Sequence, residues 1–428
     1  MPDRTFRFIH ASDLWLDIPA RGLADIPESL GDVLIDAPMK TAEKIFQTAC
    51  TEHVDMVILS GNILNPRLSD LRAHLFLVEQ FRHLATQGIA VYWAGGRYDT
   101  PEAWPEVFEL PENVTFFPSD RVETVVHRRD ESTEVAAIRG FSRGDNPRIP
   151  IGGFHGDEDG LFTIAVLNYT GNPDIFQSRN IDYCALGGTA VRRTLPGVRP
   201  VINWPGSPMG RSPAEKGAFG FSLVDVEGSR SHTTFVPTGR LRWITERVTI
   251  DRSTSRDDLL LQLMERAESL RQMGGAAELL VSWVIDGSGP LLNELSSASR
   301  DGDEAQARLL QELQEGTGSG GAPNSVKSNG GVKTSRVWNV AMSVHPADML
   351  PQVFYQQKNL LNDYLQTISN YQMNPEEPID LNAFMSKSQR EGKIGRIAQL
   401  GSASERESVL REAAILGVDL LSSEGSQR

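Results

Sequence analysis

The stretch DMVILSGN, residues 55–62, has the form of a buried strand that stops at a glycine turn. FRFIHASD (residues 6–13) precedes it and VYWAGG (residues 91–96) follows it, and each is again an apolar run that ends in small or polar residues. Apolar residues at helical spacing predict helices over 39–53 and 71–86, between these runs. This alternating order predicts a largely parallel sheet covered by helices.

Beyond residue 113 the chain becomes rich in strands, and helices are scarce. The predicted strands cover 114–117, 122–127, 135–139, 162–167, 183–186, 200–204, 219–226 and 232–237. The sequence therefore predicts an α/β (α+β) fold, with a β-sandwich flanked by helices in four layers rather than a doubly wound open sheet.

The chain divides into three predicted parts. Residues 1–240 form the sandwich domain, and residues 241–345 form a small α+β capping domain with strands over 243–250, 279–285 and 337–344 and a helix over 256–271. Residues 315–333 (EGTGSGGAPNSVKSNGGVK) are rich in Gly, Ser and Asn, which predicts a disordered loop or flexible linker inside that domain. Residues 346–428 form a tail with helices expected near 350–371 and 405–421.

The amino-acid composition excludes several classes of protein. The chain has 428 residues, and 42 Lys and Arg against 56 Asp and Glu give a net charge of −14. That balance argues against a protein that coats nucleic acid through bulk charge, although it leaves room for a local basic groove. Two cysteines, Cys50 and Cys184, exclude a disulfide scaffold and a cysteine zinc site. No signal peptide or membrane-spanning run is visible, so we expect a cytoplasmic protein that does not enter membranes.

Polar or glycine-containing turns follow several of the predicted strands. They contain Asp13, Asn62, Asp99, Asn168 and Gly188. In α/β sheets ligands bind beyond the carboxyl ends of the strands, so the turns predict a site built from loops on a rigid sheet. The alternative is that Gly, Asn and Asp simply end the strands.

Six blocks in order resemble the SbcD-type DNA repair exonuclease family, which belongs to the calcineurin-like binuclear metallophosphoesterases. They are FRFIHASDLWLD (6–17), DMVILSGNILNP (55–66), VYWAGGRYDTPEAW (91–104), FTIAVLNYTG (162–171), DYCALGGTAVRR (182–193) and WPGSPMGRSPAEKGAFGFSLVDVEG (204–228). The resemblance covers about residues 5–240. It implies a metallophosphoesterase fold and, in an active member, two metal ions that hydrolyse phosphodiesters.

Most residues at the implied ligand positions differ from the family pattern. Asp13 remains, but Trp15 stands at a metal-binding His and Asn62 at the Asp that bridges both metals. Arg97 stands at an Asn ligand and Tyr98 at the catalytic His. The other implied His positions hold Asn168, Gly188 and Ala190.

This residue set predicts that the two-metal site is lost, that no cofactor is bound and that the chain is a pseudoenzyme. Two Mn²⁺ ions need anionic and imidazole ligands, whereas amide oxygens are weak ligands and a guanidinium repels a metal. The alternative is an active Mn²⁺-dependent nuclease or phosphoesterase with an atypical site around Asp13, Asn62, Tyr98, Asp99 and Asn168.

The arginines near these blocks allow two interpretations. Arg97 is expected either to pair with Asp13, Asp99 or both in a vacated pocket, or to retain a phosphate-binding role. Arg192 and Arg193, with Arg199 and Arg211, form either a basic rim for DNA or ordinary surface arginines.

Two other motifs in the sequence predict no further site. Residues 140–144 match the G-x-S-x-G pattern around Ser142, but the Pro-containing stretch 145–150 that follows does not favour the helix that a nucleophile elbow needs. A G-x-G-x-x-G at 316–321 lies in the low-complexity insert, so it predicts no nucleotide site.

The tail provides the partner hypothesis. In the SbcD-type family a C-terminal helical segment docks on the coiled coil of an SbcC-like ATPase, and a homodimer is also compatible with the resemblance. The apolar stripe that would dock contains Leu350, Val353, Phe354, Leu360, Leu361, Tyr364 and Leu365. The alternative is that this stripe packs on the phosphatase domain.

Overall fold

The computed structural model describes most of the chain. The described residues are 5–20, 23, 28–130, 132–145, 148–157, 160–195, 199–215, 218–239, 241–273, 278–296, 302–318, 335–345, 360–374, 406, 409–410, 413–414 and 416–417. They form two compact units, one of residues 1–244, 273–280 and 323–338 and the other of residues 245–272, 281–322 and 339–428. Among the described residues, no helix combines the length and apolar character that crossing a membrane requires.

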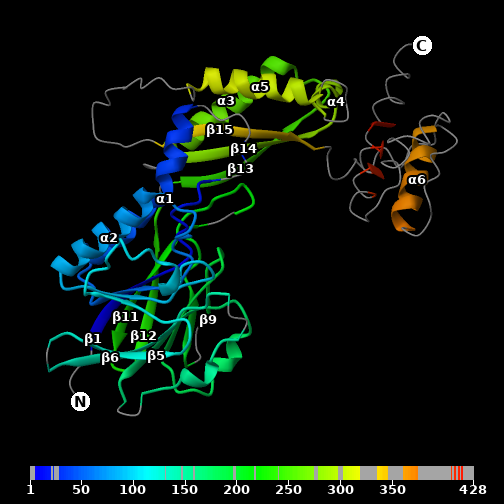
Figure 1. Cartoon of the computed structure of the whole chain (residues 1–428). Helices are drawn as coiled ribbons and strands as arrows, with labels where there is room; N and C mark the ends of the chain where they lie inside the picture. Colours follow the sequence, from blue (N-terminus) through cyan, green and yellow to red (C-terminus); the bar gives the residue numbers. More distant parts are fainter. Residues whose placement is uncertain are drawn as a thin grey trace. The chain divides into compact units, whose positions relative to one another are not determined.

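The first sheet has six strands in the order β12-β11-β1-β2-β3-β4. Its strands β1, β11 and β12 are labelled in Figure 1. Strands β1 to β4 are parallel, as the sequence predicts, and β11 closes antiparallel onto β1. The strands are β1 (Thr5–Ala11), β2 (Met56–Leu59), β3 (Ala90–Trp93), β4 (Val114–Phe116), β11 (Gly220–Glu227) and β12 (Arg230–Pro237).

Two helices, α1 (Glu28–Thr51) and α2 (Leu71–Thr86), cover one face of the first sheet. Phe46 of α1 and Phe81 of α2 are fully buried in the core that lies between these helices and the sheet. The prediction that the first helix begins at Met39 was wrong, because the helix continues through Pro38. Proline usually breaks a helix interior by removing an N–H donor, which is why the sequence favoured a later start.

The second sheet has the order β5-β6-β7-β8-β10-β9 and packs against the first through a shared apolar core. Its strands are β5 (Glu123–Arg128), β6 (Glu134–Phe141), β7 (Phe162–Asn168), β8 (Tyr183–Gly187), β9 (Arg193–Leu195) and β10 (Val201–Trp204). The predicted α/β sandwich is therefore confirmed, although β9 was missed. The short 3-10 helices η2 (Ile151–Gly153) and η3 (Pro173–Phe176), rather than long helices, contribute to the fourth layer.

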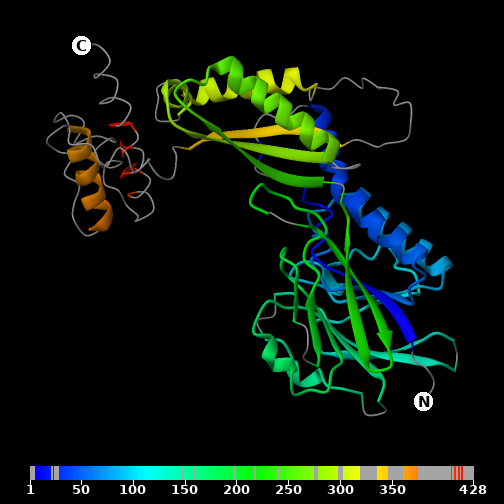
Figure 2. The same ribbon diagram turned by 180° about the vertical axis from the view of Figure 1, so that it is seen from behind.

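The small predicted domain has the three-stranded sheet β13-β14-β15, formed by Leu241–Ile250, Glu278–Gly287 and Arg336–Val344. Helices α3 (Arg256–Met273) and α5 (Gly302–Gly316) lie along one face of it in both ribbon views (Figures 1 and 2). The sequence missed α4 (Pro290–Leu295) and α5, and residues 315–316 of the predicted insert end α5. Residues 319–333 of that insert lie outside the described residues.

In the tail, the helix predicted near 350–371 is α6 (Leu360–Met373), and residues 350–359 lie outside the described residues. Leu361, Leu365 and Ile368 of α6 are buried against Leu410 and Ala414 of the tail itself. The hydroxyl of Tyr364 donates to the carbonyl of Ala413. The inner part of the predicted docking stripe is therefore used within the tail, which neither sequence interpretation anticipated.

A fully buried histidine joins the two sheets. His10 Nε2 lies 2.9 Å from Ser60 Oγ, and Asn203 Nδ2 lies 3.0 Å from His10 Nδ1. Because the amide of Asn203 donates to Nδ1, the hydrogen of the neutral ring is on Nε2. Burial lowers the pKa of His10 to about 3, so the ring is neutral in the folded protein.

This histidine predicts a loss of stability in acid. Between pH 6.5 and 3 the unfolded chain binds a proton at His10 and the folded chain does not, so the free energy of unfolding falls as pH falls. The contribution of His10 is about 2 kcal/mol between pH 7 and pH 5. We expect His10→Gln to be less stable than the parent at pH 7, with a gap that narrows by about that amount at pH 5. Urea unfolding at both pH values measures it.

The matched control is His83→Gln, which replaces an exposed histidine at the end of α2. Its gap from the parent should stay small at both pH values. An H10Q gap that is equal at pH 7 and pH 5 would contradict the buried neutral ring.

Candidate functional site

The turns after five strands meet at one edge of the sandwich. Asp13 follows β1, Asn62 follows β2, Asp99 follows β3, Asn168 ends β7 and Gly188 follows β8. Hydrogen bonds link Asp13 to Asn62 and Gly188, Asn62 to Asp99, and Asn168 to the carbonyl of Ser60. The structure thus brings together the polar residues that the sequence placed at strand ends.

Asp13 is buried at the centre of this cluster. Its Oδ1 accepts a hydrogen bond of 2.8 Å from Asn62 Nδ2, and its Oδ2 accepts one of 2.9 Å from the backbone N–H of Gly188. Burial raises the pKa of Asp13, while these hydrogen bonds and the charge of Arg211 oppose the rise. Both carboxylate oxygens are therefore engaged by N–H donors from this chain.

Asn168 and Gly188 stand at two positions of the cluster where the resemblance implies histidines. Asn168 Nδ2 donates to the carbonyl of Ser60 at 3.1 Å. Gly188 has a positive φ of 100°, and a Cβ added there would lie 2.9 Å from Asn168 Oδ1. A side chain at position 188 would be strained and crowded, so glycine suits this turn.

Asp99 is fully buried and holds two of the turns. Its Oδ1 accepts from the backbone N–H groups of Asn62 and Gly96, at 3.1 and 2.9 Å. Its Oδ2 accepts from the backbone N–H of Ile63 and the indole of Trp93, at 3.0 and 3.1 Å. Burial raises the pKa of Asp99 to about 7 against the opposing effect of these donors. Sequence reasoning did not foresee this role, and the only signal was an Asp placed three residues after a strand-ending glycine.

The expected pairing of Arg97 with Asp13 or Asp99 was wrong. Arg97 Nε lies 3.2 Å from Asp145 Oδ1, and the two side chains are 66% and 86% exposed. Both carboxylates that it was expected to meet are buried and satisfied by N–H donors, so bringing a guanidinium to them would cost its hydration. Arg97 therefore lies at the surface of the site rather than within it.

Two aromatic rings belong to the turns that carry Asp13 and Asp99. Trp15 and Tyr98 meet edge to face with their ring centroids 6.1 Å apart. The guanidinium of Arg211 lies 5.3 Å from the centre of the Trp15 ring, and that of Arg97 lies 5.4 Å from the centre of the Tyr98 ring. Tyr98 is 40% exposed. The positions of the implied first His and catalytic His thus carry an aromatic pair flanked by two cations.

The other predicted residues lie in or beside the second sheet. The guanidinium groups of Arg192 and Arg193 lie over the rings of Phe235 and Trp204, at 4.5 and 5.4 Å from their centroids. Arg199 pairs with Asp182. The carbonyl of Ala190 accepts from the backbone N–H of Ser207 at 3.1 Å.

Ser142 has a structural role. It is fully buried, its hydroxyl donates to the carbonyl of Phe117, and it accepts from the backbone N–H of Gly95 at 2.8 Å. A nucleophile needs an exposed hydroxyl beside a base, and no titratable group contacts this one in the hydrogen bonds that the described residues form.

The residues present do not fit a pair of metal ions. A pair of divalent cations needs several carboxylate or imidazole ligands, whereas Asp13 is the one carboxylate at the implied ligand positions and each of its oxygens already accepts an N–H hydrogen bond. Within the described ranges, no three His, Cys, Asp or Glu side chains are grouped so that they could hold one ion.

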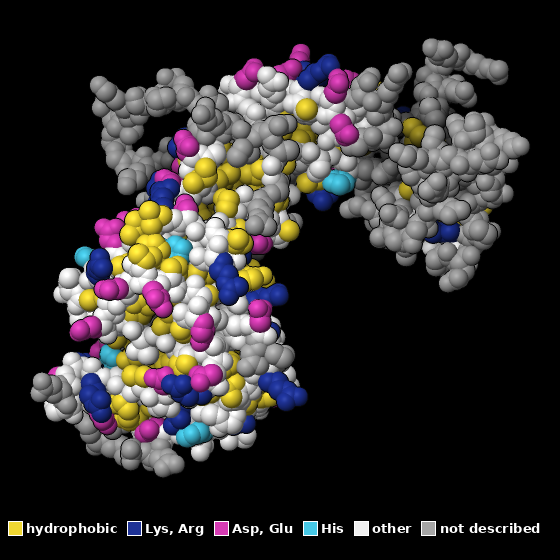
Figure 3. Space-filling model, viewed as in Figure 1, with side chains coloured by type: hydrophobic (Ala, Val, Ile, Leu, Met, Phe, Trp, Pro, Cys, Tyr) yellow, Lys and Arg dark blue, Asp and Glu magenta, His cyan; other side chains and the backbone are white. Residues whose placement is uncertain are grey.

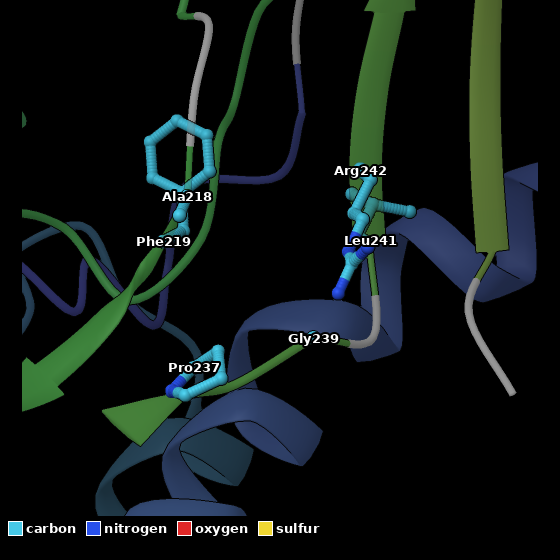
Figure 4. A pocket seen from close by; sticks show the side chains of 6 residues that line it. All are labelled: Ala218, Phe219, Pro237, Gly239, Leu241 and Arg242. Atoms are coloured by element: carbon cyan, nitrogen blue, oxygen red, sulfur yellow. The ribbon is translucent and has the colours of Figure 1, made fainter. Parts of the chain in front are cut away.

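A separate pocket of about 290 Å³ lies near the loop between β12 and β13 (Figure 4). Its lining residues are Ala218, Phe219, Pro237, Gly239, Leu241 and Arg242. None of the predicted site residues lines it, so we assign it no part in the site.

Comparison with known proteins gives the family. No protein-family model matches the chain. The chain is 28% identical over 309 residues to the uncharacterized metallophosphoesterase YhaO of Bacillus subtilis, a match that covers 66% of this chain and 72% of that protein. The chain is similar in sequence to the metallophosphoesterases and has a metallophosphoesterase-like fold. The metallophosphoesterase-like sandwich predicted from the six blocks is thereby confirmed.

Several solved structures resemble this chain, with low TM-scores and low sequence identity. A predicted phosphoesterase from Streptococcus pneumoniae is 16% identical, with a TM-score of 0.26 over 55% of this chain and 90% of that one. A dimetal phosphatase from Danio rerio is 8% identical, with a TM-score of 0.31 over 54% of this chain and 98% of that one. Vps29 of Entamoeba histolytica complexed with Zn²⁺ is 17% identical, with a TM-score of 0.26 over 54% and 99%.

The bonds of Asp99 predict a destabilising substitution. In Asp99→Asn, an NH₂ group replaces one oxygen and faces two N–H donors, so two hydrogen bonds are lost in a buried place. We expect the free energy of unfolding at pH 8, where the carboxylate is ionised, to fall by at least about 2 kcal/mol. Asp145→Asn makes the same chemical change at an exposed ion pair and should cost less than about 1 kcal/mol. Equal urea midpoints for the two variants would contradict this role of Asp99.

Proposed function

We propose that this metallophosphoesterase is a degenerate SbcD-type protein that acts without catalytic metals, as a structural or regulatory partner in DNA maintenance. The six blocks over residues 5–240 support the family, and the substitutions at the implied ligand positions support the loss of hydrolysis. In this proposal the protein does not cleave DNA itself, and it is a pseudoenzyme that needs no cofactor.

The observation that carries the proposal is the pair of hydrogen bonds on Asp13. Asn62 stands where the resemblance implies a metal-bridging carboxylate, and its amide donates to the remaining carboxylate instead of sharing a cation with it. The N–H of Gly188 occupies the other oxygen. A metal ion would have to share Asp13 with both donors, and Asn62, Asn168 and Tyr98 would add only neutral oxygens to its ligand set.

The atypical active site considered above receives little support from these contacts. Its second carboxylate would be Asp99, whose two oxygens each accept two N–H donors. Releasing that carboxylate for a metal would leave buried backbone N–H groups of two turns without partners, which is costly.

The partner remains part of the proposal. We propose that an SbcC-like coiled-coil ATPase binds the tail. Leu361 and Leu365 pack on Leu410, whereas Leu360 and Leu416 are exposed in the described part of the tail, and we propose that such apolar side chains contact the partner. DNA and a homodimer are further proposed partners.

Metal content tests the proposal. After equilibration with Mn²⁺ and desalting, we expect inductively coupled plasma mass spectrometry to find less than about a tenth of an ion per chain. The parent and Asp13→Asn should be indistinguishable, since one carboxylate among neutral amides is too weak a ligand set to retain the ion. Neither protein should cleave single- or double-stranded DNA in Mn²⁺.

The opposite result would be about one or two Mn²⁺ per chain that are lost in Asp13→Asn, together with cleavage that disappears in that variant. Circular dichroism of the variant provides the folding control. Such a pattern would establish the atypical active site in place of the proposal.

A further inference from the structure

We propose that the Arg97–Tyr98–Trp15–Arg211 cluster is a metal-independent binding site for a nucleotide unit, that is, an unpaired base with its phosphate. The inference rests on the proposed function, because a site without metals needs other groups to hold a phosphate ester. It goes further by assigning a ligand class and the residues that bind it.

The position of the cluster favours a ligand. Trp15 follows β1 and Tyr98 follows β3, so both rings lie at the carboxyl ends of parallel strands, where sheets of this kind bind ligands. Trp15 has a positive φ of 47° in a turn whose backbone is tied to the next strand by the hydrogen bond from its N–H to the carbonyl of Asn62. The sheet therefore restrains the backbone that carries the aromatic pair.

The exposure of Tyr98 provides the stacking surface. Its side chain is 40% exposed although its ring already contacts Trp15 and Arg97. A large aromatic surface that a protein leaves open beside the site is suited to stacking a base, and base–aromatic stacking needs no particular base.

The two guanidinium groups provide the phosphate contacts. Each lies within 5.4 Å of a ring centre, Arg97 at Tyr98 and Arg211 at Trp15. Cations so placed next to a stacked base are within reach of the phosphate that the base carries. The ion pair of Arg97 with Asp145 is exposed, and exposed pairs contribute little, so a phosphate can replace that carboxylate.

A paired duplex does not fit this arrangement, because its bases are stacked on one another and cannot reach the ring. The same base and phosphate occur in a free nucleotide and in single-stranded nucleic acid. The inference names the shared unit, and competition between the two sources identifies which one binds.

The experiment measures fluorescence anisotropy of a labelled dT12 oligonucleotide with the full chain at low salt in EDTA, so that metals play no part. We expect binding by the parent and by Tyr98→Phe, which keeps the ring. Tyr98→Ala should weaken binding by about tenfold or more, as loss of one stacked base does. Arg97→Gln should weaken binding and lessen its salt dependence.

Arg121→Gln is the matched control. Arg121 is 64% exposed and pairs with the exposed Asp120, as Arg97 is 66% exposed and pairs with Asp145. Binding should be unchanged in R121Q. A duplex of the same length should bind more weakly than dT12, and dTMP should displace dT12 better than inorganic phosphate does.

Absence of dT12 binding at low salt, equal binding by Tyr98→Ala and the parent, or equal displacement by dTMP and phosphate would each overturn the inference. Because the assay contains EDTA, its failure is distinct from a failure of the proposed function. The latter would appear as bound Mn²⁺ in the metal analysis and would leave the anisotropy result unaffected.

Discussion

The carboxylate of Asp99 is the constraint on which this site depends. It ties the backbone after β2 to the backbone after β3 through the N–H groups of Asn62, Ile63 and Gly96. The turn after β2 includes Gly61 and Asn62, which both have positive φ, a conformation that costs energy for any residue other than glycine. A buried anion that accepts these N–H groups stabilises the turn in this shape, and the shape fixes where Asn62 points.

Asn62 connects this turn to the rest of the site through hydrogen bonds. Its amide holds Asp13, and Asp13 in turn holds the N–H of Gly188 after β8. The cluster is therefore a closed network of hydrogen bonds between the two sheets. Asp13 and Asp99 therefore find hydrogen-bond donors within the protein, as buried carboxylates need. With Asn62 and Gly188 at these positions, the sandwich still ties its strand ends together.

The sequence was informative where burial decides structure. The apolar runs before Asp13, Asn62 and Gly95 predicted three parallel strands correctly, because a strand buried on both faces leaves an uninterrupted apolar signal. Prediction from sequence was wrong at Pro38, which lies inside α1 although proline usually breaks a helix. It also missed β9, which has only three residues. The amphipathic helix α5 was missed beside the low-complexity insert.

For the site, the sequence predicted which residues meet but not how they bond. Spacing placed Asp13, Asn62 and Asn168 at strand ends, which is a property of the two sheets. Whether a side chain pairs with Asp13 or turns to solvent depends on desolvation in three dimensions, and this is why Arg97 was misassigned. The role of Asp99 was not predicted, because most of its partners are backbone N–H groups, which every residue type except proline has.

The net charge of −14 can now be related to these contacts. Acidic and basic side chains are interspersed over the visible face of the molecule (Figure 3), and Arg97, Arg192, Arg193 and Arg199 each contact an aromatic ring or a carboxylate of this chain. Mixed charges on that face do not add up to a broad positive field that would attract a polyanion from a distance. Any affinity for nucleic acid must therefore arise at short range, from stacking and from a few guanidinium groups that exchange weak intramolecular partners for a phosphate. Short-range recognition of that kind distinguishes an unpaired base from a duplex, which bulk charge cannot do.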